Sequence, residues 1–445
     1  MAVTTTGPGT DIYQRPVELL QDLIRFDTTN PPGAEAACIA YVNNLLSEAG
    51  IECKILFSDP ERPNLIARLP GEGSAPPLLM HGHVDVVTTR NQPWHHPPFG
   101  AEIADGMVWG RGALDMKGGV TMMLCAMLRA KAEGASLPGD VILAVLSDEE
   151  NGSDHGAKFL VENHPDLFAG VKYALGEGGG VARYVEGRRF YPVMVAEKQI
   201  CWIKATVRGP GGHASRPMRG GTMARLGEML TRLDRNRLPV HITPVAQQMI
   251  ETMARALPEE SGGALGQLLD PARTDAVLDE MGPRGFFFDP VLHNTVNATI
   301  VNGGHKVNVI PSEVVVEMDG RLLPGHTAED YLAELRAVIG DEVELEVLRN
   351  DAITHEPDLG LFPTLQGILE EADPEGVPVP FLMFAVTDGR FFSQLGIQPY
   401  GFLPLNVPQE PDFVRLVHAA DERVPVSALA FGVDALFKLV QRFTA

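Results

Sequence analysis

Apolar runs that stop at polar residues organise the first half of the chain. Residues 77–87 (PLLMHGHVDVV) carry His83 and Asp85 in alternation, residues 140–146 (DVILAVL) lead into an acidic stretch, and residues 171–175 (VKYAL) lead into a glycine-rich one. Continuous apolar runs of this length are typical of strands buried on both faces of a parallel sheet. Helical periodicity recurs between them, so the pattern predicts an alternating β/α series.

The pattern changes after Glu197, where residues 200–207 alternate as in a strand with one solvent-facing side. From about Gly360 the helix–strand alternation returns. We therefore expect an α/β domain with a mixed, mostly parallel sheet from residues 1–195 and 352–445, interrupted by a smaller α+β domain of residues 196–351. Predicted helices are 16–26, 34–49, 119–132, 155–162, 222–234, 244–256, 274–280, 328–338 and 426–443, and further strands are 52–57, 64–69, 294–301 and 313–322.

Chemically active side chains follow the three apolar strands. Ligand sites in open α/β sheets lie at the carboxyl ends of the strands, so these side chains are expected at one edge. Carboxylates gathered in this way repel one another unless cations lie among them, and imidazole beside carboxylate suits zinc. The sequence therefore predicts a metal site. The side chains are His83, Asp85, Glu149, Glu150 and Glu177, and Asp115, in the turn WGRGALDMKGG before a helix, can join them.

Composition narrows the possible partners. The 445 residues carry a net charge of −22 with a pI near 5.0, which argues against nucleic acid because phosphate binding needs clustered Lys and Arg. The four cysteines are far apart and are expected to be buried thiols rather than disulfides. Neither a signal peptide nor a membrane span is visible, so we expect a cytoplasmic protein without a membrane partner.

Seven motifs occur in order along nearly the whole chain. They are HGHVDVV (81–87), GRGALDMKGG (110–119), SDEENG (147–152), GEGGG (176–180), GPGGHASRP (209–217), DGRLLPG (319–325) and HAADERVPV (418–426). Together they resemble the two-zinc amidohydrolase family of aminoacylase, acetylornithine deacetylase, succinyl-diaminopimelate desuccinylase, carboxypeptidase G and yeast carboxypeptidase S. The resemblance implies a zinc-exopeptidase-like catalytic domain and an inserted lid and dimerisation domain.

The resemblance also implies roles for residues at matching positions. Two zinc ions per chain, with Co²⁺ or Mn²⁺ as substitutes, are expected from it. Asp115 is expected to bridge the two ions, with a cis peptide bond following it at Met116. The full ligand set implied is His83 and Glu177 for one zinc, Glu150 and His418 for the other, and the bridging Asp115.

The same resemblance implies the catalytic pair. Asp85 is expected to orient His83 from behind, as in carboxylate–histidine–zinc arrangements. Glu149 is expected to act as general base towards a water that bridges the zinc ions. His213 of GPGGHASRP resembles the lid donor to the oxyanion. The motif leaves open whether it serves its own subunit or a neighbour in a homodimer.

Substrate contacts are implied on both domains. Asn297 and Arg321 resemble residues that bind the carboxylate of the amino-acid product, a task that suits the guanidinium fork. Thr387 and Gly389 of VTDGRFF resemble a substrate-binding turn. The expected substrate is a dipeptide, short peptide or N-acyl amino acid with a free α-carboxylate.

Two alternatives remain open at the level of sequence. One is a dedicated biosynthetic desuccinylase or deacetylase, because those enzymes share the same motifs. The other is a non-catalytic zinc-binding protein on the same scaffold. Loss of Glu149 or of a ligand would have favoured the second alternative, but all of these residues are present.

Overall fold

The computed structural model describes residues 9, 11–352 and 356–444. The chain divides into two compact units. Unit 1 comprises Met1–Val195, Pro357–Phe381 and Thr387–Ala445, and unit 2 comprises Ala196–Glu356 and Leu382–Val386. Most of unit 2 thus lies in sequence between the two main parts of unit 1, and the short segment Leu382–Val386 also belongs to it.

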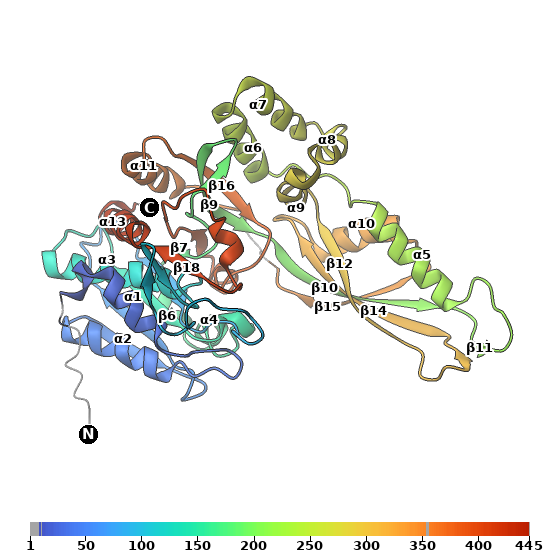
Figure 1. The fold of residues 1–445 in the computed structure, drawn as a ribbon, viewed down its shortest axis with the longest axis horizontal. Helices are drawn as coiled ribbons and strands as arrows, with labels where there is room; N and C mark the ends of the chain where they lie inside the picture. Colours follow the sequence, from blue (N-terminus) through green and yellow to red (C-terminus); the bar gives the residue numbers. More distant parts are fainter. Residues whose placement is uncertain (1–8, 10, 353–355, 445) are drawn as a thin grey trace. The chain divides into compact units, whose positions relative to one another are not determined.

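A mixed sheet forms the centre of unit 1 (Figure 1). Its central part is a parallel series of four strands in the order β6, β3, β7 and β17. At one side of this series β2 pairs antiparallel with β6, and β1 pairs antiparallel with β2. At the other side β9 pairs antiparallel with β17. The predicted fold class is confirmed. In sheet order the strands are β1 (Glu52–Leu56), β2 (Asn64–Leu69), β6 (Val141–Leu146), β3 (Leu78–His83), β7 (Tyr173–Gly176), β17 (Gln398–Gly401), β9 (Arg188–Glu197) and β16 (Val377–Met383), and β8 (Arg183–Val185) pairs with β9.

Helices cover both faces of this sheet because its strands are apolar on both faces. On one face, α4 and α12 bury Leu160 and Phe392 against Leu79 and Ile142. On the other, α3 packs on β3 and against α1 and α13. The helices of unit 1 are α1 (Pro16–Ile24), α2 (Ala36–Glu48), α3 (Lys117–Glu133), α4 (Ala157–Asn163), α11 (Phe362–Ala372), α12 (Gly389–Ser393) and α13 (Val426–Arg442), with short 3-10 turns η1 (Ile12–Gln14), η2 (Glu149–Asn151), η3 (Pro165–Phe168) and η6 (Phe413–Leu416).

A small antiparallel sheet completes unit 1. This sheet pairs a hairpin within residues 103–109 with a strand at residues 423–425. It therefore brings together segments that are far apart in the sequence. Its strands are β4 (Ile103–Ala104), β5 (Met107–Trp109) and β18 (Arg423–Pro425), in the order β18-β5-β4.

Unit 2 contains an antiparallel sheet with one face covered by helices. Along β14, exposed or half-buried residues alternate with buried ones, as predicted for a sheet with one solvent-facing side. Helices α5 and α10 lie side by side over the sheet (Figure 1) and bury Leu226 and Leu335 in its core. In sheet order the strands are β12 (Thr295–Gly303), β14 (Glu313–Leu322), β10 (Gln199–Arg208) and β15 (Glu344–Asn350), and β11 (Gly212–His213) and β13 (Val309–Ile310) form a separate pair.

The helices of unit 2 follow the predicted periodicity closely. A Thr243 side chain caps α6, and a reciprocal pair formed by Thr327 and Asp330 caps α10, as expected for these residue types at helix starts. The elements are α5 (Thr222–Arg235), α6 (Pro244–Ala256), α7 (Glu259–Gly266), α8 (Thr274–Met281), α9 (Asp289–Leu292) and α10 (Ala328–Ile339), with η4 (Gln267–Leu269) and η5 (Gly282–Phe287).

Strands β9 and β15 are elements that the hydrophobic pattern did not predict. β15 lies at a sheet edge, and its residues are alternately exposed and half-buried, so it lacks the apolar run that identifies a central strand. All four cysteines are free thiols, as predicted, but Cys53 is only half-buried, whereas the other three are buried as expected. In the described part of the chain, none of the helices has the length and apolar character needed to span a bilayer.

Candidate metal centre

Three parallel strands of unit 1 end at the same edge of the sheet. His83 is the last residue of β3, and Glu177 directly follows β7. Glu149 and Glu150 occupy the turn η2, just beyond the end of β6. The structure therefore brings these four side chains together, as parallel strand ends require.

Asp115 and His418 reach this edge from other segments. Asp115 lies in the turn before α3, and the peptide bond between Asp115 and Met116 is cis, which confirms the expectation from the resemblance. His418 lies in the segment between η6 and β18. Glu422, four residues later in the same motif, accepts the backbone N–H groups of Leu114 and Asp115 at 2.7 and 3.1 Å. The motif at 418–426 thus fixes the Asp115 turn as well as supplying a histidine.

The two oxygens of Asp115 face two different imidazoles. Oδ1 lies 3.3 Å from Nε2 of His83, and Oδ2 lies 3.0 Å from Nε2 of His418. A second carboxylate lies near each imidazole. Oε2 of Glu177 is 3.8 Å from Nε2 of His83, and Oε2 of Glu150 is 3.2 Å from Nε2 of His418. The five side chains thus form two histidine–carboxylate groups joined at Asp115.

Two atoms of this cluster have unmet hydrogen-bonding capacity. Nε2 of His83 and Oδ1 of Asp115 are buried and have no hydrogen-bond partner among the described residues. Buried polar atoms are normally paired, so the two atoms fit a role as metal ligands. The mixture of imidazole nitrogen and carboxylate oxygen is a donor set that zinc accepts. The residues present therefore fit the metal ions that the resemblance implies.

The pKa values at the cluster reflect its crowding of charges. Burial, followed by the charge of Asp115, raises the pKa of Glu177 to about 8. Hydrogen bonding to Asp115 and Glu150 raises the pKa of His418 to about 10. Burial, followed by the charge of Glu177, raises the pKa of Glu149 well above its usual range. Without a bound cation, the cluster therefore retains protons at neutral pH.

Asp85 lies behind the cluster and holds it through several contacts. Its Oδ1 is 3.5 Å from Nδ1 of His83, while its backbone carbonyl oxygen is closer at 3.0 Å. Its two carboxylate oxygens accept the backbone N–H groups of Glu149 and Glu150, each at 3.1 Å. Asp85 therefore positions the η2 turn as well as the His83 ring.

Asn30 is a contributor that sequence reasoning missed. Its amide donates to Oδ2 of Asp85 at 2.8 Å and to Oδ1 of Asp148 at 3.0 Å. Arg62 pairs with the same Asp148 at 2.8 Å. No spacing in the sequence marks Asn30, because it lies 55 positions from Asp85 and outside the seven motifs. Only the fold brings it to the cluster.

The turn that carries Thr387 and Gly389 lies beside the glycine-rich segment after β7. Oγ1 of Thr387 accepts the backbone N–H of Gly389 at 3.0 Å, and both residues are buried. A Cβ atom on Gly178 would lie 3.5 Å from the Thr387 methyl group. Asp388, between them, accepts a hydrogen bond from the hydroxyl of Ser153. The turn thus packs next to Glu177, while its contact with substrate stays a prediction.

Two of the predicted substrate residues share one face of the unit 2 sheet. Asn297 pairs across from Asp319, and Thr295 pairs across from Arg321, so Asn297 and Arg321 are diagonal neighbours. Arg321 donates from Nε and Nη2 to the two carboxylate oxygens of Asp319 at 2.7 and 3.0 Å. Asp319 was not singled out from the sequence, although it begins the motif DGRLLPG.

His213 lies at the other end of the unit 2 sheet. Arg321 pairs with Ile200 at the start of β10, while Glu313 pairs with Arg208 at its end. β11, which contains His213, comes after that end and pairs with Val309 of β13. At about 3.3 Å per residue, the eight steps from Ile200 to Arg208 span roughly 26 Å. The structure therefore does not bring His213 and Arg321 together within one unit 2.

This arrangement of strand-end histidines and carboxylates on a mixed α/β sheet defines a metallohydrolase. Residues 79–442 match the family described as Peptidase family M20/M25/M40, and the chain belongs to this family of metallopeptidases and aminoacylases. The predicted family is thereby confirmed.

Relatives and solved structures agree with this assignment. The chain is 28% identical to probable carboxypeptidase S-like 2 of Dictyostelium discoideum over 83% of this chain and 72% of that protein. It is 24% identical to human aminoacylase-1 over 98% and 97% of the two chains. The M20 family metallo-carboxypeptidase Sso-CP2 of Sulfolobus solfataricus has the same fold, with a TM-score of 0.66, 16% identity and coverage of 96% and 98%.

Proposed function

We propose that this protein hydrolyses the amide bond of dipeptides, short peptides or N-acyl amino acids that bear a free α-carboxylate. The observation that carries the proposal is the position of Asp115 between His83 and His418, with Glu149 at the same edge of the sheet. Relatives named as aminoacylase and carboxypeptidase S-like support this class of substrate.

Five residues are proposed to hold two zinc ions. His83 and Glu177 would hold one, Glu150 and His418 would hold the other, and Asp115 would be shared by both. Bound zinc supplies a water of lowered pKa and polarises the substrate carbonyl group. Asp85 acts through His83 and η2 and is a positioning residue.

Glu149 is proposed as the general base and acid. It takes a proton from the attacking water and gives it to the nitrogen of the leaving amine. A carboxyl group suits this task when its pKa lies closer to neutrality than usual, and burial beside Glu177 raises the pKa of Glu149. His213 is proposed to donate a hydrogen bond to the oxyanion.

Arg321 and Asn297 are proposed to bind the α-carboxylate of the substrate. Asp319 engages Nε and Nη2 of Arg321, which holds the guanidinium in one orientation. The side of the guanidinium that carries Nη1 is proposed to donate to the substrate carboxylate. Thr387 and Gly389 are proposed to contact the rest of the substrate.

We propose a homodimer through unit 2, and the placement of Arg321 and His213 at opposite ends of the unit 2 sheet supports it. If both side chains contact one substrate, residues at opposite ends of a strand that spans roughly 26 Å must come from different chains. We therefore propose that His213 serves the active site of a neighbouring subunit.

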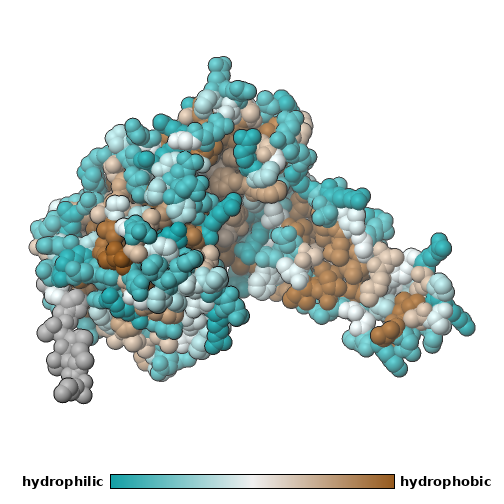
Figure 2. Space-filling model, in the orientation of Figure 1, coloured by the Kyte–Doolittle hydropathy of each residue, from teal (hydrophilic) through white to brown (hydrophobic). Residues whose placement is uncertain are grey.

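The surface of unit 2 offers a place for this contact. β12 is an edge strand whose Ile300 and Val301 side chains are about half exposed, and exposed apolar edge strands tend to pair. Figure 2 shows apolar side chains gathered over the strands of unit 2. We propose that β12 of two copies meet at this edge.

Turnover with and without zinc tests the proposed function. Chelator-treated protein would be assayed with dipeptides and with N-acetyl, N-succinyl and long-chain N-acyl amino acids, before and after Zn²⁺ is restored. Zinc-dependent release of a free amino acid is the expected result. Activity confined to the N-succinyl or N-acetyl substrate would favour the dedicated biosynthetic deacylase. No turnover of any substrate would favour the non-catalytic zinc-binding protein.

A further inference from the structure

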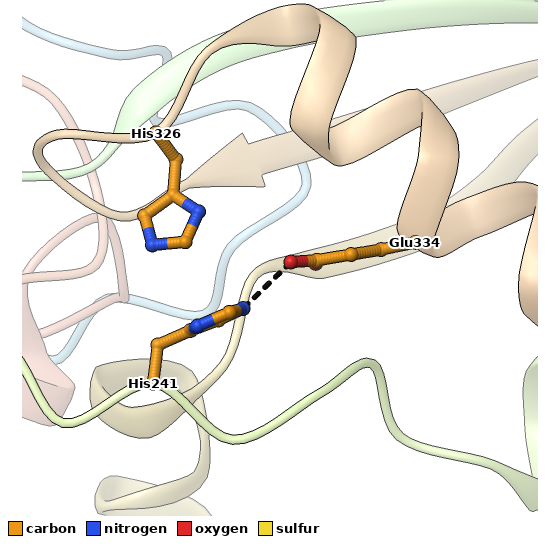
Figure 3. A group of neighbouring side chains, drawn as sticks. All are labelled: His241, His326 and Glu334. Carbon is orange, nitrogen blue, oxygen red and sulfur yellow. Dashed lines mark hydrogen bonds and ion pairs between the residues drawn. The ribbon is translucent and has the colours of Figure 1, made fainter.

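Unit 2 holds a second cluster of potential metal ligands, separate from the one in unit 1. His241 precedes α6, His326 precedes α10, and Glu334 lies on α10. Figure 3 shows that the two imidazole rings and the carboxylate point toward one another. One donor atom from each of the three residues lies within 4.8 Å of the other two. The family resemblance implies no metal-binding or catalytic role for any of the three residues.

The contacts within this cluster are close. Nε2 of His241 is 2.6 Å from Oε1 of Glu334, and the rings of His241 and His326 have centroids 4.2 Å apart in an edge arrangement. Zinc bonds of about 2.0–2.2 Å place neighbouring ligand atoms roughly 3.3 Å apart in a tetrahedron. Small side-chain rotations therefore suffice to give the three donors that separation.

Asn294 fixes the orientation of this cluster from behind. It is buried, and its Oδ1 accepts the backbone N–H of Leu323 at 2.8 Å. Its amide nitrogen therefore faces inward, 2.9 Å from Oε2 of Glu334 and 3.4 Å from Nδ1 of His326. An amide donor at that position favours the tautomer of His326 that keeps a lone pair on Nδ1, and this is the atom that would bind an ion in place of the long contact to Asn294. Orientation of ligands by such outer partners is typical of metal sites.

The backbone that carries the cluster is also held in place. The N–H of His241 donates to the carbonyl oxygen of Leu292 at 2.7 Å. His326 directly precedes Thr327, which caps α10 together with Asp330. The cluster therefore joins a loop, a helix start and the second turn of the helix, each at a defined position, so the ligands are preorganised before an ion arrives.

A simple ion pair accounts for only part of the arrangement. His241 and Glu334 satisfy one another, but His326 directs a second imidazole to the same point, and like-charged imidazolium rings would repel. The side chains of His241 and Glu334 remain 26% and 13% exposed, so an ion and its water ligands can enter.

We propose that His241, His326 and Glu334 form an additional site for a divalent transition-metal ion, with zinc as the best fit. Two histidines and one glutamate are a known zinc ligand set, and water completes the coordination. The site would cross-link the segment before α6 to α10 within unit 2. It shares no ligand with the cluster around Asp115.

Zinc stoichiometry in the full-length protein tests this proposal. Protein stripped with chelator would be dialysed against buffered micromolar Zn²⁺, and bound zinc would be counted for the wild type and for His241→Gln, His326→Gln and Glu334→Gln. Each variant is expected to bind one equivalent less than the wild type because three ligands define the site. The difference between proteins carries the test, so it is independent of how many ions the unit 1 cluster holds.

His305→Gln provides a matched control, because His305 is an exposed histidine of the same unit. It is expected to bind as much zinc as the wild type. Circular dichroism spectra identify any variant that fails to fold, and three separate variants keep the test decisive. Equal stoichiometry in the wild type and all folded variants would overturn the site, as would an equal loss in His305→Gln.

Discussion

Oδ1 of Asp115 lies 3.3 Å from Nε2 of His83, and both atoms are buried without a hydrogen-bond partner among the described residues. The facing lone pairs cannot satisfy one another unless a proton or a cation lies between them. A shared cation resolves this arrangement, and the second oxygen of Asp115 extends it to His418 at 3.0 Å. The first prediction therefore concerns Asp115.

Replacement of Asp115 should empty both metal positions. Asp115→Ala removes the oxygen that each position shares, so bound zinc should fall by about two equivalents relative to the wild type, as measured by elemental analysis. Asp166→Ala, at an exposed residue of η3, is the control and should keep the wild-type content. If Asp115→Ala retains all of its zinc, the bridging role is wrong.

The neighbouring glutamates should separate in their effects. Glu149→Gln removes only the proton carrier, so kcat should fall by roughly 10²–10⁴-fold while zinc content is retained. Glu150→Gln removes a ligand from the metal position that Glu150 shares with His418. This variant should therefore lose about one equivalent of zinc. Parallel assays of turnover and metal content make the comparison. A Glu149→Gln enzyme with near-normal kcat would rule out the base assignment.

Zinc affinity at this cluster should rise with pH. In the metal-free protein, the pKa values of His418 and Glu177 are raised to about 10 and about 8, so both groups bind protons at neutral pH. Zinc needs the deprotonated forms. Affinity should therefore weaken as pH falls from 8 to 6 and strengthen in the opposite direction, as measured by competition with a chelator at each pH. His418→Ala should reduce the slope, and an affinity independent of pH would contradict the raised pKa values.

His213 should affect rate rather than metal content. His213→Ala should lower kcat by about 10²–10³-fold, as expected for loss of one oxyanion donor, with zinc unchanged. Ser215→Ala, which removes the hydroxyl 2.7 Å from Nδ1 of His213, should have a smaller effect. Mixing His213→Ala with Glu149→Gln protein should restore some activity if the histidine acts in a neighbouring subunit. A verified mixed dimer with no activity would contradict that arrangement.

Arg321 should determine the requirement for a free carboxylate. Amidation of the substrate carboxylate should cost the wild-type enzyme about 1.5–3 kcal/mol in kcat/KM, because a charge-assisted pair is lost. Arg321→Ala should treat acid and amide alike, and Arg321→Lys should recover little because a point charge does not reproduce the fork. Measuring kcat/KM for one dipeptide and its amide on all three proteins completes the comparison. Equal cleavage of acid and amide by the wild type would remove Arg321 from substrate binding.

The sequence by itself determined the fold class and most elements of this protein. Buried parallel strands such as β3 and β6 are apolar on both faces, so the hydrophobic pattern identifies them locally. Because parallel strands end at a common edge, the sequence also indicated that His83, Glu149 and Glu177 lie together. The family was recognisable because seven motifs occur in a fixed order.

Only the tertiary structure decided which distant residues complete each site. His418 lies 268 positions from Glu150, and no local pattern relates the two. The same holds for Asn30 behind Asp85, and for His241 beside Glu334, which are 93 positions apart. Periodicity reports which side chains share a face of one helix or strand, whereas contacts between segments depend on how whole elements pack. The three-residue cluster in unit 2 therefore became visible only in the folded chain.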